Sequence, residues 1–411
     1  MKKIRGLKCL GCGREYNQAE AKYNCPSCSE NLDIVYDYEE IRKTFSRKDL
    51  SQNKDYSIWR YEPLLPIEGL TKVPPLQIGW TPLYEAKKLG KNLFLKDDGK
   101  NPSASFKDRA SAVTIVRAQE LGARIVTGAS TGNAGSSMAC LAASLEISTV
   151  IFVPQKAPKA KITQLLIFGA KVIMVKGTYD EAFDLCLEAT KEYGWYNRNT
   201  GYNPYTREGK KTCAYEICEQ LNWEVPDKVF VPVGDGNIIS GIWKGFKDLK
   251  EIGFIDRLPQ LVAVQSELSN AVVRAVKTSI QHPGSRIQIE PVKATTIADS
   301  ISVDIPRDGL AAVKAIQESK GLAVEVSDEE ILEAIKIVAR ATGIFGEPAG
   351  VTSYAGYKKL KEKGEIEGKE RIVCLITGNG LKDIDSGMKV AGEPFLIEPT
   401  LEALKEIISN K

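Results

Sequence analysis

One stretch of sequence decides the fold class: Arg124-Ile125-Val126-Thr127-Gly128-Ala129-Ser130-Thr131-Gly132-Asn133-Ala134-Gly135. Residues 124–127 are mostly apolar and β-branched, which predicts a strand, and residues 134–145 predict a helix. The loop between them, residues 129–135, is built of small residues, so its backbone N–H groups can approach a ligand. A strand, a small-residue loop and a helix in this order predict one unit of a parallel α/β layer.

The same alternation continues along the chain. Short apolar and β-branched runs are typical of parallel strands buried on both faces. We expect further strands at residues 149–153, 171–175, 228–233, 261–264 and 372–376, and helices at residues 159–168 and 179–193. A later helix is punctuated by a capping box of Ser327 with Glu330 and by Gly343 at its end. The charged residues 41–59 also predict a helix. The pattern indicates doubly wound α/β domains.

Length and charge narrow the class of protein. The chain has 411 residues, of which 43% are hydrophobic, so we expect two or three domains. Its formal net charge of +3 comes from interspersed acidic and basic residues, which disfavours nucleic acid or an anionic membrane as partner. No stretch approaches the roughly 20 apolar residues that span a bilayer. We therefore expect a soluble, cytoplasmic protein.

Four of the nine cysteines form two knuckles, Cys9-x-x-Cys12 and Cys25-x-x-Cys28. This spacing is typical of four thiolates that bind a structural zinc ion with no open position for chemistry. Two local disulfides and an iron site of rubredoxin type are the alternatives. The other five cysteines are scattered along the chain, which indicates a reducing compartment. Acidic residues surround the knuckles and disfavour a nucleic-acid role for this ribbon.

A second loop of small residues follows the strand expected at residues 228–233. It reads Val233-Gly234-Asp235-Gly236-Asn237-Ile238-Ile239-Ser240-Gly241 and leads into a helix. Glycine backbone at the N-terminus of a helix favours a phosphate group. Neither this loop nor the first contains the Gly-x-Gly-x-x-Gly pattern of dinucleotide sites, so nicotinamide chemistry is disfavoured.

One lysine lies where it can act as a nucleophile. Lys107 belongs to the run Asn101-Pro102-Ser103-Ala104-Ser105-Phe106-Lys107-Asp108-Arg109, in which Pro102 and Ser103 are expected to form a turn and a helix cap. The only histidine is His282, in a polar turn, so a catalytic mechanism that depends on imidazole is disfavoured. A desolvated lysine that binds an aldehyde and then acts as a base fits these limits. The sequence therefore favours pyridoxal phosphate as cofactor.

Several of these motifs together resemble the threonine synthase family. The segments are residues 101–109, 130–135, 234–237 and 376–383, supported by Glu347-Pro348-Ala349-Gly350 and Thr296-Ile297-Ala298-Asp299-Ser300, and the resemblance extends from about residue 59 to residue 383. The N-terminal ribbon is similar to those on some threonine synthases and on archaeal cysteate synthases. The resemblance implies a carbon–oxygen lyase that converts O-phosphohomoserine and water to threonine and phosphate by γ-elimination and β-addition.

The resemblance also implies an architecture. A zinc ribbon at residues 1–40 would precede two doubly wound three-layer α/β domains of the tryptophan synthase β type. Residues 90–205 would form the smaller domain with Lys107 and the Asn133 loop, and residues 41–89 and 206–411 the larger domain with the phosphate loop. A homodimer is the family default.

Roles for single residues follow from the resemblance. Lys107 would hold the cofactor as a Schiff base, with Phe106 beside it, and would then act as acid and base. Asn133 would bond the hydroxyl of the pyridine ring, and Thr377 would face the ring nitrogen, where a hydroxyl suits elimination better than transamination. The cofactor phosphate would lie in a cradle made by Gly234, Asp235, Gly236, Asn237 and Ile238.

One segment departs from the family pattern. The family's substrate-phosphate segment reads Asn-Pro-x-Arg-x-x-Gly-x-Lys-Thr, whereas this chain has Thr206 at the arginine position and Arg207 one residue later. On a helix one residue is a rotation of about 100°. We expect the substrate to be bound by Ser130, Thr131, Asn203, Arg207 and Lys211, with Lys210 as a further candidate.

The departure leaves other substrates open. Cysteate synthase, which combines O-phosphoserine with sulfite, and an amino acid dehydratase are the neighbouring enzymatic alternatives. A non-catalytic binding module is disfavoured because such a module has no need for an activated amine.

Overall fold

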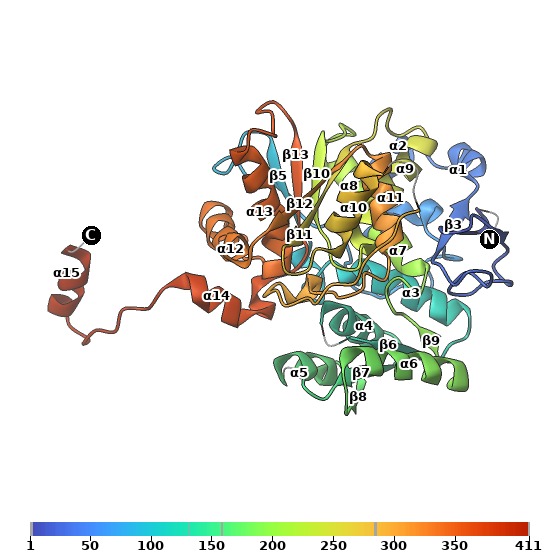
Figure 1. Ribbon diagram of the computed structural model, residues 1–411, viewed down its shortest axis with the longest axis horizontal. Helices are drawn as coiled ribbons and strands as arrows, with labels where there is room; N and C mark the ends of the chain where they lie inside the picture. The colour runs from blue at the N-terminus through green and yellow to red at the C-terminus, as the bar shows by residue number, and fades with distance from the viewer. Residues whose placement is uncertain (1–2, 131, 158, 283–285, 410–411) are drawn as a thin grey trace.

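The computed structural model describes residues 3–130, 132–157, 159–282 and 286–409, and it contains three β-sheets. Figure 1 shows a large upper α/β body, a smaller lower one, and a small N-terminal sheet at one side. The N-terminal region comprises β1 (Ile4–Cys9), β2 (Glu15–Tyr16), β3 (Leu32–Tyr36), α1 (Tyr38–Thr44), α2 (Arg47–Gln52) and the 3-10 helix η1 (Ile58–Leu64). Its three strands pair in the antiparallel order β2-β1-β3.

The larger sheet has six strands in the order β12-β11-β10-β13-β5-β4 and is parallel except for the edge strand β4. Every residue of the central strands β10 and β13 is buried, as expected for a sheet covered on both faces. The strands are β4 (Leu83–Glu85), β5 (Leu93–Asp97), β10 (Lys228–Pro232), β11 (Gln260–Ser266), β12 (Leu322–Val326) and β13 (Ile372–Ile376).

Helices accompany this sheet on both sides (Figure 1). They are α7 (Tyr205–Lys210), α8 (Thr212–Gln220), α9 (Asn237–Glu251), α10 (Ala271–Gln281), α11 (Gly309–Glu318), α12 (Asp328–Thr342) and α13 (Pro348–Glu362), with the short 3-10 helices η2 (Asp98–Lys100), η3 (Asp299–Ile301) and η4 (Gly380–Lys382). The expected capping box at Ser327 is confirmed, because its hydroxyl accepts from Glu330 N and the Glu330 carboxylate accepts from Ser327 N.

The smaller sheet has four parallel strands in the order β8-β7-β6-β9. Its strands are β6 (Ile125–Ala129), β7 (Ser148–Pro154), β8 (Lys171–Val175) and β9 (Tyr196–Asn197), and its helices are α4 (Asn133–Ala143), α5 (Lys159–Ile167) and α6 (Tyr179–Tyr193). Helix α3 (Lys107–Glu120) packs against both α4 and α7 and so joins the two α/β bodies. The alternation expected from sequence is therefore confirmed.

Two expectations about local structure change. Residues 41–59 are not one helix, because Ser46 caps a new helix with Asp49 after α1 has ended at Thr44. Strand β5 pairs with β13 in the six-stranded sheet, although we expected the smaller domain to begin at residue 90. The first difference follows from a local cap that interrupts a charged segment, and the second follows from long-range strand pairing. The remaining division into domains stays a prediction.

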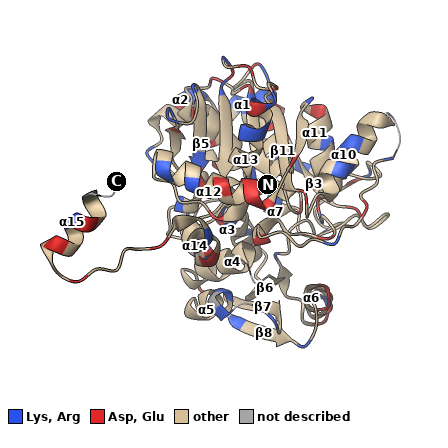
Figure 2. Ribbon diagram, turned by 60° about the vertical axis from the view of Figure 1, so that its left-hand side comes forward, with Lys and Arg blue, Asp and Glu red and all other residues tan. Residues whose placement is uncertain are grey.

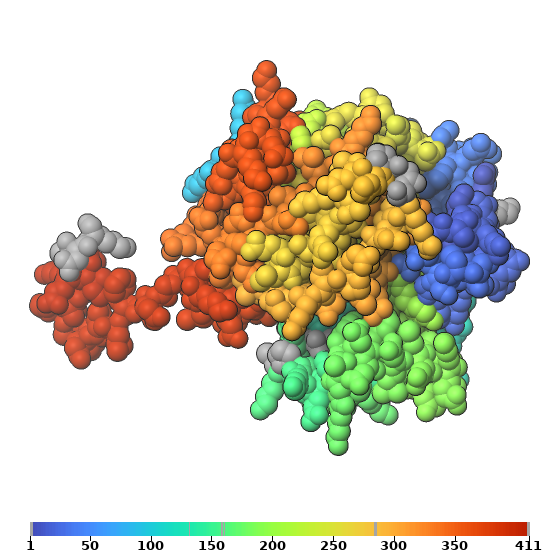
Figure 3. All heavy atoms as spheres, viewed as in Figure 1, coloured from blue at the N-terminus to red at the C-terminus, as the bar shows by residue number. Residues whose placement is uncertain are grey.

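One apolar core runs through the N-terminal sheet, α3 and both α/β bodies. It joins Leu7 of β1, Val113 of α3, Val126 of β6 and Val231 of β10 in one cluster of buried side chains. The N-terminal sheet is thus continuous with the rest of the molecule, and in Figure 3 it lies directly against it. None of the helices in the described ranges combines the length and apolar character that a membrane crossing requires. Basic and acidic residues are interspersed along the chain (Figure 2).

The C-terminal segment leaves the body. Helices α14 (Ile384–Ala391) and α15 (Leu401–Ser409) are joined by a coil, and α15 stands free of all other elements in Figures 1 and 3. Several large apolar side chains of this segment are exposed, including Phe395, Leu396 and Leu401.

Candidate active site

A cavity of about 370 Å³ lies between the two α/β bodies. Its walls come from the loop after β6, the loop after β9 and residues 299–307 of the larger body. A second, narrower cavity of about 30 Å³ adjoins it and reaches the ends of β10 and β13. Five residues line both cavities, so they form one continuous site: Lys107, Asn133, Thr200, Asp235 and Ser300. Ligands of parallel α/β sheets bind at this carboxyl edge.

Lys107 begins α3 and lies where the two cavities meet. Burial lowers the pKa of its amine, and the charge of Arg198 lowers it further, against the opposing effect of Asp235. A larger fraction of neutral amine is what a nucleophile or base needs near neutral pH. The preceding residue, Phe106, is fixed by a hydrogen bond of 2.9 Å from its N–H to Thr377 O.

The expected cap of α3 is wrong. The helix starts after Phe106, which has helical backbone angles and makes no side-chain cap. Ser103 instead donates from its N–H and its hydroxyl to the carboxylate of Asp108, at 2.7 and 2.5 Å. Asp108 is buried and belongs to the first turn of α3. The turn that presents Lys107 is therefore fixed by a side chain within the helix and not by a cap before it.

Asn133 is the first residue of α4 and is buried. Its side-chain amide donates to Glu347 Oε1 at 2.8 Å and to Ser300 Oγ at 3.2 Å. Burial raises the pKa of Glu347 to about 7, although Lys382 and the Asn133 amide favour the charged form. A carboxyl that titrates near neutral pH therefore lies beside Asn133 at the narrow cavity, a position that the family resemblance alone did not assign.

The glycine loop after β10 curves around the narrow cavity and leads into α9. Gly236 has φ of +90°, and a Cβ on Gly234 would lie 2.9 Å from Ile301 Cα, so larger residues do not fit at these two positions. The first N–H groups of α9 have no partners within the helix, which makes this end a favourable place for an anion. Thr377, which is buried directly after β13, lines the same cavity.

Lys210 adds a positive charge beside this loop. It is fully buried on α7, and its Nζ donates to Asn237 Oδ1 at 2.6 Å. Burial lowers its pKa well below the usual range, and the charges of Lys107 and Arg198 lower it further. No carboxylate of the described residues forms an ion pair with it. An anion at the glycine loop would supply the missing counter-charge.

The other residues expected to bind substrate lie in different places. Ser130 lines the larger cavity, and Thr131 falls outside the described residues. Asn203, Arg207 and Lys211 line neither cavity. The amide of Asn203 is bound to Asn197 O and Tyr205 N, so it shapes the turn before α7.

The charges of Arg207 and Lys211 are already neutralised by acidic partners. Arg207 forms ion pairs with Asp308 at 2.6 Å and Asp33 at 3.1 Å, and Lys211 does so with Glu208 at 2.6 Å and Asp248 at 2.7 Å. The sequence made both side chains candidates for the substrate, and in the structure neither of them lines a cavity.

The same ion pairs attach the N-terminal sheet to the site. Asn31 donates to Asp308 Oδ1 at 2.9 Å, and Asp308 Oδ2 accepts from Asn237 of the glycine loop at 2.7 Å. Arg207 joins Asp308 to Asp33 of β3. The position of the loop thus depends on a segment more than 200 residues away in the sequence.

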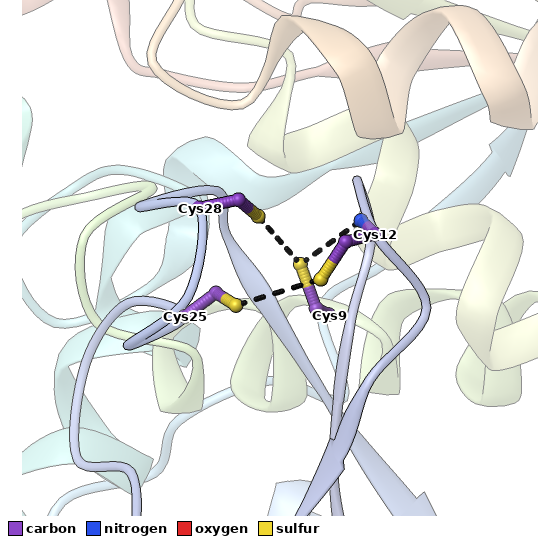
Figure 4. A group of neighbouring side chains, drawn as sticks. All are labelled: Cys9, Cys12, Cys25 and Cys28. Atoms are coloured by element: carbon purple, nitrogen blue, oxygen red, sulfur yellow. Dashed lines mark hydrogen bonds between the residues drawn. The ribbon is translucent and has the colours of Figure 1, made fainter.

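Figure 4 shows the four cysteines of the N-terminal sheet, whose sulfurs point toward one another. All four Sγ atoms lie within 4.8 Å of one another, with Cys9 to Cys28 at 3.4 Å and Cys12 to Cys25 at 3.7 Å. All nine cysteines of the chain are free. The four thiols can hold one metal ion with four protein ligands, which leaves no position for a substrate.

Comparison with known proteins agrees with this geometry. Residues 75–378 match the family described as pyridoxal-phosphate dependent enzyme. The threonine synthase of Methanocaldococcus jannaschii is 43% identical over 410 residues, covering 98% of this chain and 99% of the relative. The threonine synthase of Methanosarcina acetivorans is 38% identical, with the same coverage of both chains.

Solved structures show the same fold. The processed form of threonine deaminase isoform 2 from Solanum lycopersicum has a TM-score of 0.63 and 26% identity, and it covers 76% of this chain and 82% of its own. Maize serine racemase, at 20% identity, has a TM-score of 0.62 over 75% of this chain and 91% of its own. The chain therefore belongs to the pyridoxal-phosphate dependent enzymes and, within them, to the threonine synthase family.

Proposed function

We propose that this chain is a threonine synthase, a lyase that converts O-phosphohomoserine and water to threonine and phosphate with pyridoxal phosphate as cofactor. The observation that carries the proposal is one continuous site in which Lys107, Asn133 and the glycine loop of α9 converge. The relatives of the same name, which match almost the whole length of the chain, support it.

The residues of the narrow cavity fit this cofactor. Lys107 would hold its aldehyde carbon, and Asn133 would bond the ring hydroxyl. The backbone of residues 234–238 would hold its phosphate, together with Lys210, which is buried and pairs with no carboxylate of the residues that the structure describes. Thr377 would face the pyridine nitrogen. When bound, the cofactor supplies an electron sink that stabilises negative charge on substrate carbons.

Lys107 would move the protons of the reaction. Its lowered pKa keeps part of the amine neutral, so it can take a proton from a substrate carbon and return it elsewhere. Because Thr377 offers a hydroxyl rather than a carboxylate, it would not keep the ring nitrogen of a bound cofactor protonated. This would limit charge delocalisation and favour elimination and replacement over transamination.

The first loop would hold the substrate carboxylate. Ser130 lines the larger cavity just before α4, where the N–H groups of the helix start are without helical partners. The carboxylate would lie at these groups, which directs the substrate side chain toward the loop after β9. Thr131 stays a candidate for the same contact.

The first experiment measures phosphate release by the purified protein loaded with pyridoxal phosphate. O-phosphohomoserine is compared with O-phosphoserine, with and without sulfite, and the amino acid product is identified. We expect threonine and phosphate from O-phosphohomoserine alone. Lys107→Ala should abolish the reaction, whereas Lys100→Ala, which removes an exposed lysine seven residues earlier, should leave it unchanged.

Other outcomes would replace the assignment. Cysteate from O-phosphoserine and sulfite would indicate a cysteate synthase, and 2-oxobutyrate without phosphate release, formed from threonine, would indicate a dehydratase. A protein that neither binds pyridoxal phosphate nor releases phosphate would be a binding module. Full activity of Lys107→Ala would contradict the role of this lysine.

We propose zinc as the metal of the four cysteines. A tetrahedral ion with Zn–S distances of about 2.3 Å separates its sulfurs by about 3.8 Å, close to the observed 3.4 and 3.7 Å. Mass spectrometry of the purified protein should find one zinc per chain. One iron per chain would indicate a rubredoxin-like site instead, and two disulfides without metal would contradict both.

We also propose that the protein is a cytoplasmic homodimer. The free cysteines favour a reducing compartment. Leu401 and Leu404 of α15 are 69% and 41% exposed, and such apolar surface is favourably covered by a second copy of the chain. Leu401→Lys with Leu404→Lys should shift sedimentation toward the monomer, and Glu402→Lys should not. A monomeric wild-type protein would contradict the proposal.

A further inference from the structure

Five arginines are buried among the described residues, and four of them are neutralised by a carboxylate. Arg198 is the exception, because no carboxylate of the described residues lies within ion-pair distance of its guanidinium. The four neutralised pairs are Arg60 with Glu219 at 2.6 Å, Arg109 with Asp98 at 2.6 Å, Arg117 with Glu120 at 2.9 Å and Arg207 with Asp308 at 2.6 Å.

Arg198 is held firmly in the wall of the larger cavity. It follows β9, and its backbone N–H donates to Thr127 O at 2.8 Å. Its Nε donates to Ser111 Oγ and its Nη1 to Thr200 Oγ1, each at 3.0 Å. Its Nη2 has no hydrogen-bond partner among the described residues. One edge of the guanidinium is therefore fixed in place while part of its donor capacity is unused.

The surroundings of Arg198 make an anion favourable there. Its side chain is 2% exposed, and burial lowers its pKa to about 10, although Asp108, Tyr179 and Asp235 favour the charged form. Lys107 and Lys210 add further positive charge nearby, since Arg198 lowers the pKa of both. A buried cation is stable only when a counter-charge compensates its lost hydration.

The proposed reaction requires two phosphate groups in the site, one of the cofactor and one of the substrate, and the two cavities differ in the cation that lines them. Lys210 contacts Asn237 and lines only the narrow cavity, so its charge belongs to the cofactor phosphate. Arg198 lines only the larger cavity. It is left without a role in cofactor binding.

We propose that Arg198, together with the hydroxyl of Thr200, binds the phosphate group of the substrate. This inference rests on the proposed function, because it assumes an amino acid phosphate as substrate. A guanidinium offers parallel N–H donors that match phosphate oxygens. The Thr200 hydroxyl accepts its bond from Arg198, so its own proton is free for a phosphate oxygen.

The same arrangement accounts for the departure at position 206. Thr206 is fully buried and donates to Asn203 O at 2.7 Å, with Asn237 Oδ1 at 3.3 Å. It supports the turn before α7 and the glycine loop, and it lines neither cavity. Arg198, eight residues earlier, supplies the positive charge that the family pattern has at 206.

The test compares binding of an unreactive phosphonate analogue of O-phosphohomoserine with that of norvaline, which has no phosphate. Both are titrated into the cofactor-loaded protein and followed by the absorbance of the cofactor. Arg198→Gln should weaken the phosphonate by about 100-fold and leave norvaline within about twofold. Arg198→Lys should restore part of the affinity. Arg117→Gln, which removes a buried guanidinium outside the cavity, should change neither.

Inorganic phosphate provides a second probe as a product inhibitor. Its inhibition constant should rise in Arg198→Gln and in Thr200→Val, which keeps the guanidinium and serves if the glutamine variant does not fold. Wild-type phosphonate affinity in folded Arg198→Gln, or in Thr200→Val when the glutamine variant is unfolded, would overturn the inference. An equal loss of norvaline affinity would also overturn it, because Arg198 would then act only through the structure of the site.

The two proposals fail in different ways. If the wild-type protein releases phosphate from O-phosphoserine and not from O-phosphohomoserine, the threonine synthase assignment fails, and the same titrations with a phosphoserine analogue decide the role of Arg198. If the wild-type protein forms threonine and Arg198→Gln keeps its KM for O-phosphohomoserine, the assignment stands and the role of Arg198 is refuted.

Discussion

The substitution Arg207→Leu tests whether this side chain stabilises the fold or binds the phosphate group of the substrate. The sequence makes this residue a candidate for the substrate phosphate, one position after the family's arginine. In the structure its guanidinium is ion-paired with Asp33 of β3 and with Asp308, which also holds Asn237 of the glycine loop. The substitution should therefore affect stability and cofactor binding before it affects substrate recognition.

The magnitude follows from the burial of the pair. Removing one member of a buried ion pair costs about 3–5 kcal/mol. The cost should lie at the lower end, because Lys244 still pairs with Asp33 at 2.6 Å and Ser240 still donates to Asp308. Unfolding entropy of about 2.1 cal/mol/K per residue over 411 residues gives about 0.9 kcal/mol/K. We expect the Tm to fall by about 3–4 °C.

The assay measures three quantities on the same preparation: Tm by differential scanning fluorimetry, the Kd for pyridoxal phosphate, and KM for O-phosphohomoserine. We expect a lower Tm and weaker cofactor binding, with KM at saturating cofactor nearly unchanged. Arg5→Leu is the matched control, because Arg5 also contacts an aspartate but its side chain is 59% exposed. An unchanged Tm together with a KM raised more than about tenfold would refute the reasoning and return Arg207 to the substrate.

Three further predictions follow from the same geometry. Chelation of the cysteine-bound metal should weaken pyridoxal phosphate binding, because the N-terminal sheet holds Asp308 through Asn31; unchanged cofactor affinity in metal-free protein would contradict this. Burial raises the pKa of Glu347 to about 7, so the folded protein favours the protonated carboxyl. The stability that this carboxyl contributes is therefore fully present below pH 4.5, its ordinary pKa, and is lost as the pH rises through 7. Between pH 5 and 8 the Tm of the apo protein should therefore fall more in the wild type than in Glu347→Gln, and parallel curves would show that this carboxyl does not titrate there. Gly209→Ala should not give soluble protein, because its Cβ would lie 1.9 Å from Arg109 O where α7 crosses α3; recovery of folded protein with a wild-type Tm would contradict that packing.

The local elements of the fold could be predicted from the sequence. The strands at residues 171–175 and 372–376 and the helix at residues 179–193 have the expected bounds. The capping box at Ser327 also forms as expected. These features depend on side chains within a few residues of one another, so a short stretch of sequence is enough to predict them.

Features that depend on distant partners could not be predicted in the same way. Strand β5 pairs with β13, which lies more than 270 residues later in the chain. Strand β9 has only two residues, so the sequence contains no apolar run that would predict this strand or the loop with Arg198 that follows it. Pairing of this kind is decided by the whole fold and leaves no periodic signal.

The sequence by itself determined the chemistry of this protein: a lysine at a helix start, two small-residue loops after strands, and four cysteines with metal-ligand spacing. Only the tertiary structure decided which cations face the cavity. A buried cation needs a counter-charge, and the carboxylates that neutralise Arg207 come from residues 33 and 308, whereas no carboxylate of the described part of the chain pairs with Arg198. Because these partners are separated by more than 100 residues, the free charge at the cavity is a property of the folded chain.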